Sequence, residues 1–184
     1  MASEIIVNTI KAPTTGANAN KVIIPSGVTL DASGGTILPS AGQIVQEKLS
    51  DVGGNTVFNG SSYADAAGFS ITITPKYSDS KFVISMWAKT AVNNASSNSA
   101  HDFRILRDST TVYSSRWTNY LNRNSYAADS YPIFMINMVD EPNTTSAITY
   151  KLQGRLYNGD SSQWSFDANG GSTKYFMSVK EIKQ

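Results

Sequence analysis

The sequence lacks several features on which whole classes of protein depend. None of its 184 residues is a cysteine, which excludes disulfide bonds and thiolate metal sites. No apolar run reaches the length of about 20 residues that a membrane-spanning helix needs. Charged residues make up only 16% of the chain and the formal net charge is +1, so no basic surface for nucleic acid or for an anionic membrane is indicated. We therefore expect neither a nucleic-acid partner nor insertion into a membrane.

Residues that carry catalysis or bind metals are also scarce. The single histidine, His101, is followed by Asp102, and a Ser/His/Asp arrangement could be assembled with any of the many serines, but no G-x-S-x-G nucleophile motif accompanies it. Other interpretations place His101 on the surface at the start of a strand, or gather three copies of it around a threefold axis as a metal site. We predict that the chain is not an enzyme, needs no cofactor and holds no metal.

The carboxylates give no second catalytic motif. Asp140 and Glu141 precede Pro142 and are interpreted as turn residues rather than as the separated pair that cleaves a glycosidic bond. Further aspartates are also expected in turns: Asp65, Asp79, Asp108, Asp129, Asp160 and Asp167.

Serine, threonine, asparagine and glycine supply most of the polar character of the chain. This composition is typical of β-rich extracellular or virion proteins. Because disulfides are absent, oligomerisation is the expected source of extra stability. The N-terminus lacks the basic region and apolar run of a secretory signal, so we expect synthesis in a host cytoplasm and release inside a particle.

Short segments in which apolar and small polar residues alternate follow one another along most of the chain. Strands are expected at residues 69–75, 81–92, 103–115 (two strands joined at 107–109), 131–142, 147–159, 164–166 and 174–182. Residues 43–52 also fit a helical face, but glycines at 42, 53 and 54 leave little room for a stable helix, so a strand is preferred. The pattern predicts an all-β fold, an antiparallel β-sandwich.

The segment 20–42 is different, because Pro and Gly interrupt it too often for a helix. Within it, IIPSG (23–27) and ILPSAG (37–42) resemble each other. One interpretation is a disordered linker. The other, favoured by the many branched apolar residues, is a short, extended, β-rich shaft that packs against two other copies of the chain. We divide the chain into residues 1–42, a particle-docking segment and shaft, and residues 43–184, the sandwich.

Several segments stand in an order that resembles a known group of proteins. They are VNTI (7–10), SKFVISMWAKTAV (80–92), FRILRDSTTVYSS (103–115), PIFMINMVDEPNTTSAITYKLQGR (132–155) and TKYFMSVKEI (173–182). Together they resemble the C-terminal domains of tail-fibre and related virion structural proteins of bacteriophages, marine ones especially. More distantly, the strand pattern is similar to the jelly roll of the complement and tumour-necrosis-factor type.

The resemblance implies a homotrimer with a jelly-roll head, located in the virion, that attaches the particle to a glycan or protein of the host surface. Its N-terminus would contact other virion proteins. Two alternatives remain open. One is a structural component that binds no receptor, such as a capsid decoration or a fibre connector, and the other is a polysaccharide-degrading tailspike-type domain.

A long aromatic stretch, SSRWTNYLNRNSYAADSY (114–131), is interpreted as a loop and as a contact surface. Aromatic faces stack on sugar rings, and Asn or Arg side chains bond to hydroxyl groups. The receptor-binding candidates are Arg116, Trp117, Asn119, Tyr120, Asn122, Arg123 and Tyr126. The alternative is that these aromatic residues pack in a trimer interface or cap the sandwich.

Overall fold

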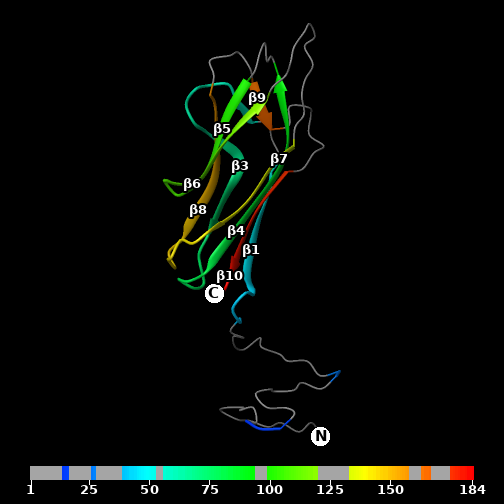
Figure 1. Cartoon of the computed structure of the whole chain (residues 1–184), viewed down its shortest axis with the longest axis vertical. Helices are drawn as coiled ribbons and strands as arrows, with labels where there is room; N and C mark the ends of the chain where they lie inside the picture. Colours follow the sequence, from blue (N-terminus) through cyan, green and yellow to red (C-terminus); the bar gives the residue numbers. More distant parts are fainter. Residues whose placement is uncertain are drawn as a thin grey trace. The chain divides into compact units, whose positions relative to one another are not determined.

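The computed structural model describes residues 14–16, 26–27, 39–52, 56–93, 99–119, 133–157, 163–166 and 175–184. The chain divides into two compact units, residues 1–38 and 39–184, and all the strands described below belong to the second (Figure 1). The predicted shaft therefore lies almost entirely outside the described residues.

The second unit is built from strands, and the described part of the chain contains no helix, so none that could cross a membrane. The strands are β1 (Ile44–Val52), β2 (Thr56–Phe58), β3 (Ala64–Ile73), β4 (Lys81–Asn93), β5 (Ser99–Arg107), β6 (Thr110–Asn119), β7 (Ile133–Asp140), β8 (Ile148–Leu156), β9 (Gln163–Phe166) and β10 (Tyr175–Ile182). The predicted all-β fold is confirmed, including the strand at residues 43–52.

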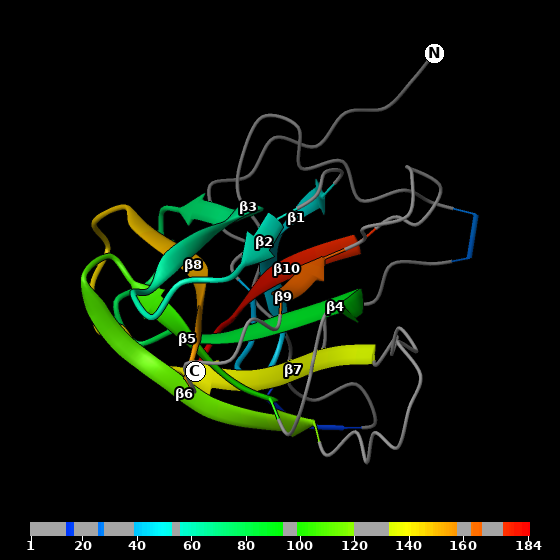
Figure 2. The same ribbon diagram turned by 90° about the horizontal axis from the view of Figure 1, so that it is seen from above.

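The strands form two antiparallel sheets. One has the order β1-β10-β4-β9-β2 with β7 also paired to β4, and the other has the order β3-β8-β5-β6. When the short β2 and β9 are left aside, the first sheet contains strands one, eight, three and six of the remaining series, and the second contains two, seven, four and five. This order is that of a jelly roll. Figure 2 shows the two sheets on opposite sides of the sandwich.

Alternation of side chains places one face of several strands in the core. In β8 every second residue is buried, from Ile148 to Leu156. Phe103 lies at the centre, with ring centroids 4.9 Å from Phe134 and 5.3 Å from Trp164. Gly154 must be small, because a Cβ atom there would lie 2.8 Å from Cε1 of Phe103.

A polar contact joins the two sheets at one end of the core. Nη1 of Arg107 on β5 donates to both carboxylate oxygens of Asp140 on β7, at 2.9 and 2.7 Å. The hydroxyl of Tyr150 on β8 donates to the same carboxylate at 2.6 Å. Burial, with the hydrogen bond to Asp140, raises the pKa of Tyr150, so the phenol stays protonated and remains a donor. Asp140 is thus a link between sheets as well as the end of a strand.

Some local predictions were wrong. Asp65 lies inside β3 and not in a turn, whereas Asp79 and Asp108 are in turns as expected. Asp129, Asp160 and Asp167 lie outside the described residues. The three-residue β2 was not predicted, because a strand this short shows no periodicity.

Candidate functional site

The predicted contact loop is only partly described, and its first residues are not a loop. Strand β6 continues to Asn119 because its end pairs with the start of β5, Ser99 opposite Asn119. Arg116, Trp117 and Asn119 are therefore strand residues. The side chains of Trp117 and Asn119 lie outside the described part. So do four further candidates in full: Tyr120, Asn122, Arg123 and Tyr126.

Arg116 belongs to a row of charged side chains across the outer face of the four-stranded sheet. In the strand register, Asp102 of β5 lies opposite Arg116 of β6 on one side and opposite Arg155 of β8 on the other. Residues that are directly opposite share a face of the sheet. Of these three residues only Arg116 is a predicted receptor-binding residue, and Asp102 is predicted only as a neighbour of His101, because residues of different strands cannot be paired from the sequence.

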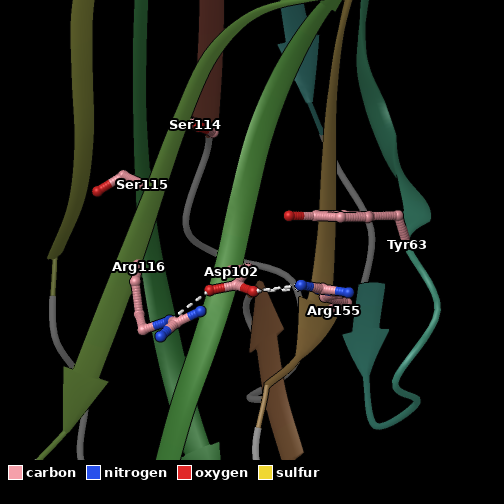
Figure 3. A pocket seen from close by; sticks show the side chains of 6 residues that line it. All are labelled: Tyr63, Asp102, Ser114, Ser115, Arg116 and Arg155. Carbon is pink, nitrogen blue, oxygen red and sulfur yellow. Dashed lines mark hydrogen bonds and ion pairs between the residues drawn. The ribbon is translucent and has the colours of Figure 1, made fainter.

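The three side chains are joined through the carboxylate of Asp102 (Figure 3). Nε of Arg116 donates to Oδ1 of Asp102 at 2.8 Å. Nε and Nη2 of Arg155 donate to Oδ2 at 3.1 and 2.8 Å. The side chain of Asp102 is only 8% exposed. Each oxygen of a nearly buried carboxylate therefore holds one guanidinium group.

The electrostatics of Asp102 favour its ionised form. Burial by itself raises the pKa of this carboxyl, but the hydrogen bonds and charges of Arg116 and Arg155 outweigh that effect and hold the pKa below its usual value. The carboxylate in turn raises the pKa of both arginines. The three groups are therefore charged together at neutral pH, with one more positive than negative charge.

Two tyrosine rings lie against the guanidinium groups of three arginines. Cζ of Arg116 lies 3.2 Å from the centroid of the Tyr157 ring. Cζ of Arg104 and Cζ of Arg155 lie 3.9 and 4.6 Å from the centroid of the Tyr63 ring. Contacts of cations with aromatic faces add stability and fix orientation. The arginine heads are thus held by an anion and by aromatic rings at once.

These side chains border a pocket. Its volume is about 350 Å³, and its walls are Tyr63, Asp102, Ser114, Ser115, Arg116 and Arg155. Figure 3 shows Asp102 between the two arginines, with the serines on β6 and the phenol of Tyr63 reaching across β8. Every wall residue carries a hydroxyl or a charge, so the pocket offers many hydrogen-bonding groups.

None of the three interpretations of His101 agrees with the structure. His101 is 0% exposed and shares the core face with Phe103, and its ring centroid is 5.2 Å from that of Trp164. Asp102, the next residue along the strand, points to the opposite face. The two cannot form a dyad, and the predicted surface position is wrong. A buried side chain also cannot meet its copies on a threefold axis. Among the described residues no group of three histidine or carboxylate side chains could hold a metal ion.

The outer face of the six-stranded sheet has the opposite character. Phe176 of β10 and Met135 of β7 lie opposite Trp87 of β4 on its two sides, so large apolar side chains form a row across three strands. Phe176 is 43% exposed and Met135 56%. Other exposed apolar residues of these strands and of β1 are Ile44, Leu49, Ile133 and Val139. We call Ile44, Leu49, Trp87, Ile133, Met135, Val139 and Phe176 together the apolar face.

Comparison with known proteins identifies no family. No family model and no curated protein matches the chain. Eighteen chains of solved structures are similar at a low level, and three of them serve as examples. The insecticidal delta-endotoxin Cry8Ea1 of Bacillus thuringiensis has 16% identity and a TM-score of 0.34, over 71% of this chain and 19% of that one. Dimeric latent PorU of Porphyromonas gingivalis has 12% identity and a TM-score of 0.33, over 78% of this chain and 14% of that one.

The third structure is the VP2 subviral particle of infectious bursal disease virus, with 14% identity and a TM-score of 0.32, over 86% of this chain and 45% of that one. This chain thus spans less than half the length of each of the three proteins. Similarity at this level carries no argument about function.

Proposed function

We propose that this chain is a virion structural protein, a homotrimeric fibre or fibre tip of a bacteriophage, that attaches the particle to the surface of its host. The observation that carries the proposal is the contrast between the two outer faces of the sandwich. One carries a row of exposed apolar side chains, and the other carries a row of charged side chains and contains a pocket.

The apolar face supports self-association. Met135 and Phe176 lie on either side of Trp87, and in a single copy of the chain Met135 and Phe176 are exposed to water. Exposed apolar side chains gathered on one sheet mark a surface that another protein covers. Association through this face would supply stability to a chain that has no disulfide.

Three copies are expected because the strand pattern resembles that of a trimeric jelly roll. The order of the eight main strands is that of a jelly roll. The sequence resembles jelly-roll heads of the complement and tumour-necrosis-factor type, and that resemblance implies three copies. Three heads on one particle attach strongly even when each binds its receptor weakly, because the second and third binding events occur at a high local concentration.

Solution mass tests the assembly. We expect the purified chain to have three times its monomer mass of 19.9 kDa by light scattering. The double variant Met135→Lys and Val139→Lys should be monomeric and still folded by circular dichroism, because exposed residues of a monomer tolerate charge but a buried interface does not.

The matched control is Ser70→Lys, which adds a charge to an exposed residue of the other sheet and should leave the mass unchanged. A wild-type chain that is monomeric at every concentration would exclude the trimer. A double variant that keeps the trimer would exclude this face as the interface.

Binding to cells tests attachment. We expect the labelled trimer to bind cells of a susceptible bacterium without releasing sugar from their polysaccharide, and the monomeric double variant to bind them far less. Release of reducing sugar would instead indicate a degrading domain. Binding to other virion proteins but not to any cells would indicate a connector or decoration.

A further inference from the structure

We propose that the pocket between Arg116, Asp102 and Arg155 binds the carboxylate of an acidic sugar, such as a uronic or sialic acid residue. That the sugar belongs to a host-surface polysaccharide rests on the function proposed above. The binding chemistry of the pocket is argued from its own residues.

The net charge of the pocket suits one negative charge. Two guanidinium groups face one carboxylate, so a single positive charge remains after Asp102 is counted. A sugar carboxylate carries one negative charge, whereas a phosphate monoester carries nearly two at neutral pH. Close to the pocket, Lys151 is paired with Asp65 at 3.0 Å, and Arg104, which lies 3.9 Å from the centroid of the Tyr63 ring, adds a further positive charge outside the walls.

Asp102 does not use every donor of the two arginines. The bonds to Asp102 use Nε of Arg116, and Nε and Nη2 of Arg155. Nη1 and Nη2 of Arg116 and Nη1 of Arg155 take no part in them. Paired guanidinium donors match the two oxygens of a carboxylate, which makes arginine the usual residue for this group. Because Asp102 and the tyrosine rings already hold the arginine heads, little side-chain freedom is lost on binding.

The remaining walls fit the neutral part of a sugar. Ser114, which lies opposite Arg104 on the outer face, supplies a hydroxyl group that donates or accepts, and Tyr63 supplies a phenol and an aromatic ring. The volume of about 350 Å³ lies at the lower end of the range for small-molecule sites, about 300–1,000 Å³. An apolar ligand would find no aliphatic wall. A small, hydroxylated anion is therefore the class of ligand that these residues favour.

Calorimetric titration of the full chain tests the proposal. The probes are the methyl glycosides of glucuronic, galacturonic and N-acetylneuraminic acid, the neutral methyl glucoside and galactoside, and inorganic phosphate. We expect at least one acidic sugar to bind with a Kd on the order of 1 mM, and the neutral sugars and phosphate to bind at least tenfold more weakly.

Two variants locate the binding. Arg116→Gln should weaken binding at least tenfold, and Arg155→Lys, which keeps the charge but loses the planar pair of donors, should do the same. Lys151→Gln removes a positive charge from the same face outside the pocket and should change the Kd less than twofold. Thermal unfolding of each variant shows whether it is folded.

Four results would overturn the proposal: no binding of any acidic sugar, phosphate binding as tightly as the sugars, binding that survives both arginine variants, and equal loss in Lys151→Gln. The proposed function fails separately. A trimer that adheres to cells but binds no acidic sugar would refute only the proposal for the pocket. A monomer that binds the sugar would refute only the proposed trimer.

Discussion

At the scale of single residues, His101 is the group whose surroundings most alter its chemistry. The ring is fully buried beside Trp164, with centroids 5.2 Å apart. Burial lowers the pKa of His101 to about 4 from its usual 6.5, although the backbone of Phe58 and the charge of Asp102 act in the opposite direction. The folded protein therefore keeps this histidine neutral at pH values where the unfolded chain protonates it.

Because of His101, we expect the folding stability to depend on pH even above the pH at which most carboxylates titrate. Between pH 6.5 and about 4 the unfolded chain binds a proton that the folded chain does not, so the free energy of unfolding falls as the pH falls. The loss over this window is at most about 3.5 kcal/mol, at about 1.4 kcal/mol for each pH unit.

Urea unfolding at pH 7, 6 and 5, at one protein concentration, measures this slope. The variant His101→Gln does not titrate and should lose most of the slope, whatever its stability at pH 7. An equal slope in both proteins would show that other groups cause the dependence.

At the scale of elements, one buried carboxylate holds the connection between β3 and β4. Glu181 of β10 accepts hydrogen bonds from the backbone N–H groups of Lys76 and Tyr77, at 2.8 and 3.2 Å, and from the hydroxyl of Ser80 at 2.7 Å. The side-chain amide of Gln46 on β1 donates to its other oxygen. Three elements that are distant in the sequence thus meet at one residue.

The variant Glu181→Gln should lower the free energy of unfolding by about 2–3 kcal/mol, because it replaces charge-assisted acceptors with an amide that turns a donor toward other donors. Glu47→Gln is the matched control. Glu47 is partly exposed on the neighbouring strand and lies 3.5 Å from Lys180, so its loss should cost less than about 0.5 kcal/mol. Urea unfolding compares the two, and equal costs would contradict the proposed role of Glu181.

At the scale of the whole molecule, residues 39–184 form a unit with its own core. Its first residues are tied to its last: the N–H of Gly42 donates to the carbonyl of Lys183 at 2.7 Å, and the N–H of Lys183 donates to the carbonyl of Gln43 at 3.0 Å. Strand β1 then covers β10 along nearly its whole length. The position of a truncation therefore determines its effect.

Removal of residues 1–38 should leave the urea midpoint of the sandwich within error, whereas removal of residues 1–52 should give unfolded or aggregated protein, because the edge of β10 and part of the core are then uncovered. Circular dichroism and light scattering distinguish these results. A lower midpoint for 39–184 would show that the first unit stabilises the second. A trimeric 39–184 would assign assembly to the sandwich.

Most of the fold could be predicted from the sequence. The apolar density of 81–92 and the period-two alternation of 147–159 predict these strands, because both are local properties of the residues. His101 is in phase with the buried Phe103 and Ile105, which indicates the core face, but the prediction of a surface position does not use this alternation. The extension of β6 to Asn119 was missed because it depends on pairing with β5.

The candidate pocket could not be predicted in the same way. Arg116 and Arg155 are 14 and 53 positions from Asp102 along the chain, and only the register of three strands makes them neighbours. Register follows from the packing of the whole core and from turn geometry, not from the residues of one strand.

The sequence by itself determined the class of fold, because the period of alternation and the Pro and Gly turns are local properties of the chain. The absence of cysteine excluded a fold held by disulfides. Only the tertiary structure decided which residues meet. It brought Asp102, Arg116 and Arg155 into one row on one sheet, and Trp87, Met135 and Phe176 into another row on the opposite sheet. The physical reason is that side chains from distant strands become neighbours only when burial of a shared core sets the register of every strand at once.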